Sequence, residues 1–168
     1  MTIHDTHPFA EPDDPVRRFR GRLGGAVSLW TAGEGADRAG LTVSSVMVAN
    51  GDPAYLLGLL DPDSDLADVL ARAGRAVVHL LSWADRDLAD AFGGTAPAPG
   101  GPFRLRDWAE EDHGPLLRER THALVSVESA TEVGWSLLVT ARIDAVSLVE
   151  DARPLEHRRG RYHDASAT

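Results

Sequence analysis

The run GLTVSSVMVA, residues 40–49, carries the clearest indication of the fold. Residues 41–49 are rich in β-branched and aliphatic residues, a composition that predicts a β-strand. Similar short segments rich in aliphatic residues occur at residues 26–31, 55–60 and 75–81. Gly, Asp and Pro punctuate these segments, as they do between the strands of a barrel.

Two more strand-like patterns follow at residues 123–128 and 135–149, which brings the expected total to six or seven strands. Two short helices are expected among them, over residues 64–74 and 84–92, each followed or ended by glycine. A weaker helical pattern covers residues 17–22. Consecutive, mostly antiparallel strands with few helices favour a mainly β, closed or partly closed barrel over a doubly wound α/β sheet.

The length of 168 residues predicts one domain, with or without a short tail. Residues 1–15 hold three prolines and four acidic residues without periodicity, so we expect a flexible N-terminal tail or an arm lying on a partner subunit. The domain is then expected over residues 16–164, with a C-terminal tail at residues 165–168. The Gly- and Pro-rich residues 93–102 predict a loop of the kind that often lies over a site.

Composition excludes several classes of chemistry. The chain has no Cys, which removes disulfides, thiolate nucleophiles and cysteinyl metal clusters. All 17 basic residues counted as Lys or Arg are Arg, which removes Schiff-base lysines and the Walker A phosphate site. A net charge of −9 argues against nucleic-acid binding, and no apolar stretch predicts a membrane span or a signal peptide. We therefore expect a cytoplasmic protein.

Sequence motifs for a metal or a catalytic triad are lacking. The seven His residues are scattered without the spacing of a metal face, and no G-x-S-x-G elbow anchors a Ser/His/Asp triad. His79 interrupts the apolar segment at residues 75–81, where a hydrogen-bonded wall histidine is the more usual role than a catalyst. No catalytic residue and no metal site is predicted.

The polar residues of the opening run suggest a ligand. Thr42, Ser44 and Ser45 place three hydroxyls within four residues, able to bind a phosphate or a ribityl chain, although a polar strand edge would look the same. The helix expected to begin near Ser64 adds unpaired N–H groups and a dipole that favour an anion. Together these two features indicate a phosphorylated ligand.

The residues also resemble a known family, the flavin reductase-like FMN-binding split-barrel proteins, from about residue 17 to residue 163. The run at residues 40–45 and five segments after it match the family's motifs in the family's order. The matching segments are GLTVSS (40–45), NGDP (50–53), DPDS (61–64), AVVHLL (76–81), LADAFG (88–93), and PL with GRY (154–155 and 160–162).

This resemblance implies a six-stranded antiparallel Greek-key split β-barrel with a few short helices, which forms a homodimer and holds FMN, or FAD or a deazaflavin, at the subunit interface. It implies cofactor contacts along residues 42–45, contacts beside the flavin ring at residues 49–50, and contacts on the phosphate side from Ser64 and, as a weaker candidate, Arg161. The residues it assigns to the cofactor are Thr42, Val43, Ser44, Ser45, Ala49, Asn50, Ser64 and Arg161.

The activity that the resemblance implies is an NAD(P)H:flavin reductase, which transfers hydride from nicotinamide to flavin N5 and supplies reduced flavin to a partner monooxygenase. The sequence departs from the family at its Gly-Asp-His motif, where Gly134, Trp135 and Ser136 stand. Trp135 either covers the flavin or packs at the dimer interface. Two alternatives therefore stay open, a flavoprotein with another reductant and a barrel that binds a ligand without catalysis.

Overall fold

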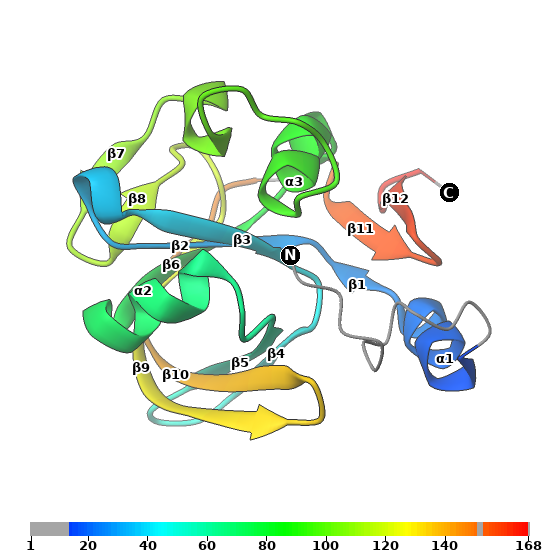
Figure 1. Ribbon diagram of the computed structural model, residues 1–168, viewed down its shortest axis with the longest axis horizontal. Coiled ribbons are helices and arrows are strands. Elements are labelled where there is room, and N and C mark those ends of the chain that lie inside the picture. Colours follow the sequence, from blue (N-terminus) through cyan, green and yellow to red (C-terminus); the bar gives the residue numbers. More distant parts are fainter. Residues whose placement is uncertain (1–13, 151–152, 168) are drawn as a thin grey trace.

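The computed structural model describes residues 14–150 and 153–167. In these residues, seven antiparallel strands form one curled sheet, which we call the main sheet, in the order β3-β2-β6-β9-β10-β5-β4 (Figure 1). Its strands are β2 (Ser28–Ala32), β3 (Ala39–Val43), β4 (Val46–Ala49), β5 (Tyr55–Leu60), β6 (Arg75–Leu80), β9 (His122–Val133) and β10 (Ser136–Ser147).

Two smaller sheets and several short helices complete the described part. The C-terminal sheet has the order β1-β11-β12, and β7 pairs with β8 as a separate hairpin. These strands are β1 (Gly25–Ala26), β7 (Ala109–Glu111), β8 (Gly114–Leu116), β11 (Leu155–Arg158) and β12 (Arg161–Asp164). The helices are α1 (Pro15–Leu23), α2 (Asp65–Ala73), α3 (Arg86–Phe92) and the 3₁₀ turns η1 (Gly35–Asp37), η2 (Trp83–Asp85) and η3 (Pro102–Leu105).

The prediction of a mainly β, antiparallel, partly closed barrel is confirmed. The main sheet has seven strands in the described residues, within the six or seven that the strand patterns predict and one more than the six that the resemblance implies. The single strand expected over residues 41–49 is two strands, β3 and β4, separated by Ser44 and Ser45. Strand-forming and small residues continue without Gly or Pro through Ser44 and Ser45, so the composition of the run does not mark the bend. The strand expected at residues 26–31 is likewise interrupted at Val27.

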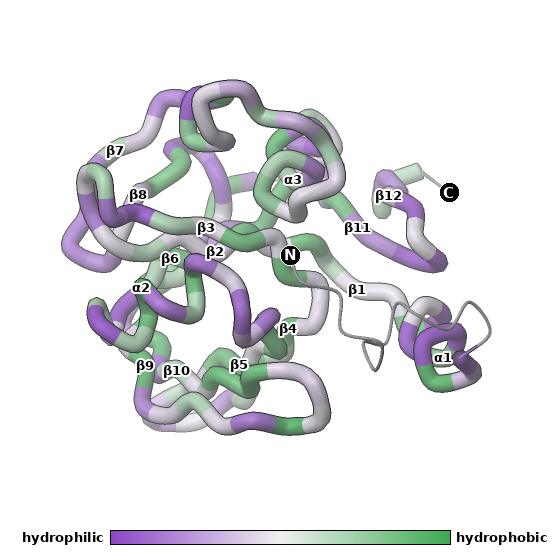
Figure 2. Tube along the Cα trace, viewed as in Figure 1, coloured by the Kyte–Doolittle hydropathy of each residue, from purple (hydrophilic) through white to green (hydrophobic). Residues whose placement is uncertain are grey.

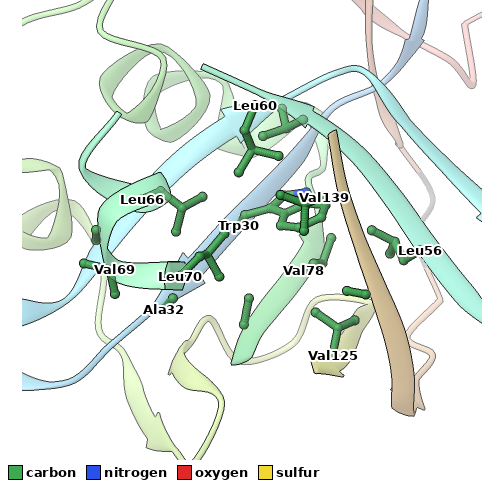
Figure 3. Packing of buried hydrophobic residues seen from close by; sticks show 14 of the residues in the cluster. Trp30, Ala32, Leu56, Leu60, Leu66, Val69, Leu70, Val78, Val125 and Val139 are labelled. Atoms are coloured by element: carbon green, nitrogen blue, oxygen red, sulfur yellow. The ribbon is translucent and has the colours of Figure 1, made fainter. Parts of the chain in front are cut away.

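Trp30 is the largest side chain in the interior of the barrel (Figure 3). It is fully buried between Leu66 and Leu70 of α2 on one side and Val139 of β10 on the other. Gly58 makes this possible, because a Cβ at that position would lie 2.6 Å from Cζ2 of the indole. The indole N–H donates to the hydroxyl of Ser28 over 3.1 Å, so its polar atom is also satisfied inside the core.

A second apolar cluster covers the outer face of the same strand. Every residue of β2 is buried, because Trp30 and Ala32 point into the barrel while Leu29 packs outward with Leu88 and Phe92 of α3. Val27 links the main sheet to the C-terminal sheet, since its N–H donates to the Leu155 carbonyl and its carbonyl accepts from the Leu81 N–H. The C-terminal sheet is thereby held against the end of β2.

The helix predictions are confirmed in position. Helix α2 begins at the cap residue Ser64 and ends at Gly74, whose left-handed conformation (φ 65°) suits glycine. Helix α3 follows the short turn η2. Helix α1 is longer than the expected residues 17–22 and has no buried residue; it projects from the sheets beside β1 and β11 (Figure 1). Apolar and hydrophilic segments both occur along it (Figure 2).

The expected N-terminal tail, residues 1–15, lies almost entirely outside the described residues; Pro15 is the first residue of α1. Of the expected C-terminal tail, Thr168 also lies outside them. Among the residues that are described, no helix has the length and apolar character needed to cross a membrane.

Candidate functional site

The most informative part of the fold is the connection between β3 and β4, which we call the seam. These are the two edge strands of the main sheet, and Ser44 and Ser45 alone join them. The Ser45 carbonyl accepts a hydrogen bond of 3.0 Å from the N–H of Leu59. The Ser44 carbonyl lies close to Gly25, where a Cβ would sit only 3.0 Å from that oxygen. The seam is therefore fixed on both sides by neighbouring strands.

The hydroxyls near the seam differ in their availability. The Thr42 hydroxyl donates to the Ala89 carbonyl over 2.8 Å and so ties β3 to α3. Val43, predicted to contact the cofactor, has its side chain in the core, where only 3% of the residue is exposed, so only its backbone is available. Among the described residues, neither the Ser44 nor the Ser45 hydroxyl has a hydrogen-bond partner, and both can serve a ligand.

A pocket of about 110 Å³ opens beside the seam. We call it the seam pocket. Its lining comes from the barrel, from the end of α3 and from the C-terminal sheet: Val27, Thr42, Ser44, Gly93, His157 and Tyr162. Whole small-molecule sites usually measure roughly 300–1,000 Å³, so the seam pocket of one chain holds only part of a cofactor. A complete site needs a further surface.

His157 and Tyr162 were not predicted as site residues. They pair directly across β11 and β12, with ring centroids 5.7 Å apart in an edge arrangement. Burial, then the nearby cations Arg20 and His163, lowers the pKa of His157 below its usual value, which keeps the imidazole neutral at pH 7. Burial, then the carboxylate of Asp90, raises the pKa of Tyr162 to about 12, so its hydroxyl stays protonated.

A sequence signal for this pair existed but was weak. In residues 155–158 the sequence LEHR alternates Leu and His with the charged Glu and Arg, which is a pattern found in strands. The motif GRY contains Tyr162, but nothing in the sequence assigns that residue a role. His157 and Tyr162 lie on the hairpin formed by β11 and β12. The pairing of β1 with β11 sets Gly25 opposite His157 and brings this hairpin to the seam. Pairing between residues so far apart in the sequence cannot be derived from local periodicity.

Ser64 does not line the seam pocket, and its hydroxyl is already engaged. It donates to the Asp61 carbonyl over 2.7 Å and accepts from the Ala67 N–H over 3.2 Å, as the cap of α2. A larger pocket of about 230 Å³ lies beside this helix, and its charged lining residues are Asp37, Asp65 and Asp68 with Arg38 and Arg72. These residues carry no excess of positive charge to attract a phosphate, so we regard the smaller seam pocket as the better candidate.

Three other predicted residues lie outside the seam pocket. Ala49 and Asn50 are exposed at the far end of β4, where Ala49 pairs with Tyr55 of β5. Arg161 is exposed at the start of β12, opposite Arg158 and next to Tyr162 in the chain. The structure thus places Thr42 and Ser44 in the lining of the pocket, with Ser45 next to Ser44 in the chain. The other predicted residues do not line the pocket: Ala49, Asn50, Ser64 and Arg161.

His79 is the hydrogen-bonded wall histidine that its position predicted. It is fully buried, its Nε2 accepts from the Leu117 N–H over 2.9 Å, and its Nδ1 therefore carries the proton donated to the Leu29 carbonyl over 3.0 Å. Burial lowers the pKa of His79 to about 4. Both ring nitrogens are used, so His79 is structural.

The chemistry available at the seam pocket is binding and orientation. Its lining offers neutral hydroxyls, an imidazole and a phenol, with no carboxylate among the lining residues. Elsewhere in the described residues no cluster of three His, Asp or Glu could hold a metal ion. Such a donor set fits the polyhydroxyl chain and ring amides of a flavin, which itself supplies the redox chemistry when bound.

Comparison with known proteins identifies the family of the chain. Residues 20–166 match the flavin reductase like domain. The NADH-dependent FMN reductase AsuE2 of Streptomyces nodosus subsp. asukaensis is 32% identical over 167 residues, which cover 95% of this chain and 89% of that protein. The reductase component of the FADH(2)-dependent resorcinol hydroxylase of Rhizobium sp. (strain MTP-10005) is 27% identical, with 90% and 84% covered.

A solved structure shares the fold. The styrene monooxygenase flavin reductase SMOB from Pseudomonas putida S12 superposes with a TM-score of 0.78 at 23% sequence identity. The aligned part covers 90% of this chain and 97% of that one. At this identity the likeness concerns the fold.

Proposed function

The chain belongs to the flavin reductase-like domain family, and on that premise we propose that it binds FMN and reduces it with NAD(P)H. It is an oxidoreductase of this family. The observation that carries the proposal is the seam, where the unengaged hydroxyl of Ser44 lines a pocket that the C-terminal sheet borders, and the unengaged hydroxyl of Ser45 follows it in the chain. Reduced flavin would pass to a partner monooxygenase, as the names of relatives such as the resorcinol hydroxylase reductase component indicate for those proteins.

The chain's own part in this reaction is to hold and orient the cofactor. FMN, when bound, accepts a hydride from the nicotinamide at its N5 atom. In the proposal Thr42 fixes the position of β3, the backbone of Val43 and the hydroxyls of Ser44 and Ser45 contact the cofactor, and no residue is assigned as acid or base. FAD or a deazaflavin would use the same hydroxyls.

Contacts from Ala49, Asn50, Ser64 and Arg161 stay predictions. Ala49 and Asn50 are exposed, so they can meet a ring that extends beyond the seam pocket. Ser64 can offer a phosphate little beyond its backbone, because its hydroxyl caps α2. Arg161 is exposed beside the pocket residue Tyr162 and is the better placed of the two for an anion.

A homodimer is part of the proposal. Helix α1 has no buried residue, yet Val16, Phe19 and Leu23 form an apolar stripe along it, with Phe19 65% exposed. A nine-residue helix is not stable in isolation, so such a stripe calls for a covering surface. Trp135 at the β9–β10 turn (65% exposed) and Met47 on β4 (71% exposed) extend the exposed apolar area. These exposures favour packing of Trp135 at an interface over a role above the flavin.

The domain limits and the location stay predictions. The family match over residues 20–166 supports one domain across most of the chain, close to the proposed residues 16–164. The tails at residues 1–15 and 165–168 and the cytoplasmic location rest on the sequence alone.

An anaerobic titration tests the function. The purified protein is loaded with FMN and titrated with NADH and then NADPH while the flavin absorbance is followed, with free FMN as the control. We expect bleaching by at least one donor, faster than in the control. Tight FMN binding without bleaching would assign another electron donor, in line with Trp135 and Ser136 standing where the family has Asp and His. Absence of FMN binding would reject the proposal.

A further inference from the structure

Arginines from two distant parts of the sequence gather on one surface, which we call the arginine patch. Helix α1 lies beside the turn between β11 and β12 (Figure 1), and the Arg159 N–H donates to the Gly21 carbonyl over 2.8 Å. A Cβ at Gly21 would lie 3.7 Å from Cα of Arg159, so the helix backbone packs directly on this turn. The patch consists of exposed arginines from both segments: Arg17, Arg18, Arg20, Arg22, Arg158, Arg159 and Arg161.

The patch is opposite in sign to the rest of the chain. Residues 15–23 contain four arginines and no acidic residue, and residues 156–161 contain three arginines and one glutamate. These two segments carry a net charge of +6, so the rest of the chain carries −15 within the total of −9. The net charge of the rest of the protein therefore repels a phosphorylated ligand, while this surface attracts it.

Ion pairing within the fold does not explain the patch. Arginines elsewhere each form an ion pair with an aspartate and so join elements of the structure: Arg106, Arg120, Arg142 and Arg153. Among the described residues, no such pair engages Arg20, Arg158 or Arg159. Like charges held together without carboxylates repel one another and cost stability, so the patch calls for a role other than folding.

The patch borders the seam pocket. Arg158 pairs with Arg161 across β11 and β12. The next pair along this hairpin is His157 with Tyr162, which form the wall of the pocket on the side of the C-terminal sheet. The charge of Arg20 reaches the same wall, since after burial it is the next cause that lowers the pKa of His157. An anion attracted to the patch thus arrives at the rim of the pocket.

We propose that the arginine patch is an electrostatic entry surface, which steers phosphorylated flavins to the seam pocket and selects them over riboflavin, which has no phosphate. The inference rests on the proposed function. It concerns the approach of the ligand and not its bound contacts, because attraction between exposed charges extends over roughly 10 Å at 0.1 M salt. Fields of this kind at a binding cleft raise association rates by about 10- to 1,000-fold.

The proposed homodimer leaves this surface open. Gly21 faces the turn between β11 and β12. Phe19 and Leu23 stand two residues before and two residues after Gly21, which places them on the opposite side of the helix. A second subunit that covers the apolar stripe therefore contacts the side of α1 that faces away from the turn.

Two triple variants of the full-length protein test the inference. The patch variant weakens the patch and keeps Arg161, the predicted phosphate contact; it combines Arg20→Gln, Arg158→Gln and Arg159→Gln. The matched control removes the same charge at exposed arginines that do not line the seam pocket; it combines Arg72→Gln, Arg75→Gln and Arg118→Gln. Circular dichroism and sedimentation verify that folding and assembly are unchanged.

Stopped-flow quenching of flavin fluorescence gives association and dissociation rates for FMN and for riboflavin, in about 0.01 M and about 0.5 M salt. For the patch variant in low salt we expect FMN association to slow about five- to tenfold, while FMN dissociation changes less than about twofold. In high salt the difference in association should shrink below about twofold, because counter-ions screen the charges. The control should match the wild type, and riboflavin should associate equally fast with all three proteins.

Equal FMN association in the patch variant and the control would overturn the inference. A faster dissociation of FMN that persists in high salt would overturn it as well, because it would place these arginines in direct contact with the phosphate. Both results leave the proposed function standing, since that function depends on the binding and reduction of FMN. A wild-type protein that does not bind FMN would reject the function and the inference together.

Discussion

The Thr42 hydroxyl donates a 2.8 Å hydrogen bond to the carbonyl of Ala89, and this bond joins the strand that enters the seam to the helix that borders the seam pocket. The same carbonyl also accepts from the N–H of Gly93 over 2.9 Å. Removing the threonine hydroxyl therefore leaves no buried acceptor without a partner. A substitution at Thr42 can therefore remove this bond without removing the hydrogen bond from Gly93 to Ala89 at the end of α3.

Thr42→Val keeps the shape of the side chain and removes this bond. We expect the free energy of unfolding to fall by about 1 kcal/mol, the usual net value of a neutral hydrogen bond. Urea unfolding followed by circular dichroism measures the change. Thr42→Ser retains the hydroxyl and should lose less stability than Thr42→Val. A loss in Thr42→Ser with none in Thr42→Val would mean that the methyl group, and not the bond, stabilises this contact.

Ser45→Ala tests the assignment of the cofactor to the seam. Since the Ser45 hydroxyl has no partner among the described residues, its removal should leave the stability unchanged. If it binds FMN, the Kd should rise about fivefold, as measured by quenching of flavin fluorescence. Ser129→Ala, at an exposed position of β9, serves as the control. An unchanged Kd would reject the placement of the cofactor contact at Ser45.

Phe19→Asp tests the dimer. A charge in the middle of the apolar stripe of α1 should prevent another surface from covering it, so the protein should sediment as a monomer at concentrations where the wild type is a dimer. The control is Arg18→Gln, on the opposite side of the helix. A wild-type protein that is already monomeric, or a variant that stays dimeric, would contradict the role of α1.

Burial of His79 predicts a pH dependence of stability. Its pKa is about 4 in the folded protein and about 6.5 when unfolded, so between these values the unfolded chain binds more protons. Stability should therefore decrease as pH falls from 6.5 towards 4, by about 3 kcal/mol for this group. The depressed pKa of His157 adds to the same trend.

The variant His79→Asn isolates the contribution of this histidine. Urea midpoints measured from pH 7 to pH 4 should show a shallower slope than in the wild type, even if the variant is less stable at every pH. The ion pair of Asp85 with Arg120 affects only the lower end of this range. Burial raises the pKa of Asp85, but the hydrogen bonds from Arg120 and Ser82 outweigh burial and lower it below 3.8, so its contribution is lost only from about pH 5 downwards. Equal slopes in the wild type and in His79→Asn would show that a group other than His79 causes the pH dependence.

Local patterns in the sequence were sufficient for the elements whose ends carry explicit signals. Ser64 and Gly74 delimit α2, and the strand at Tyr55–Leu60 has the predicted bounds. The short strands β7 and β8 were missed, because three residues around Pro115 are too few to show alternation. The hairpin of β11 and β12 is visible in the sequence only as the motif segments PL and GRY, which do not predict two strands.

The candidate site was predictable only in part, for a different reason. Thr42, Ser44 and Ser45 are consecutive or nearly so, and a cluster of hydroxyls is visible in one segment. The facing wall at His157 depends on which strand pairs with β1, and this pairing spans more than a hundred residues. The prediction that Val43 contacts the cofactor shows a further limit of the sequence. Side chains alternate between the two faces of β3, so the valine beside the hydroxyls of Thr42 and Ser44 points into the core.

The seam also bears on the motions of the barrel. It connects the first and last strands of the main sheet, so it is the place where the curled sheet would open. Edge strands are among the first parts of a protein to exchange their amide hydrogens with solvent. A cofactor bound at Ser44 and Ser45, as proposed, would bridge both edges at once and slow that exchange in β3 and β4 together. Loss of the cofactor and loosening of the barrel would then be a single event, visible in the exchange rates of two strands that have no backbone pairing with each other.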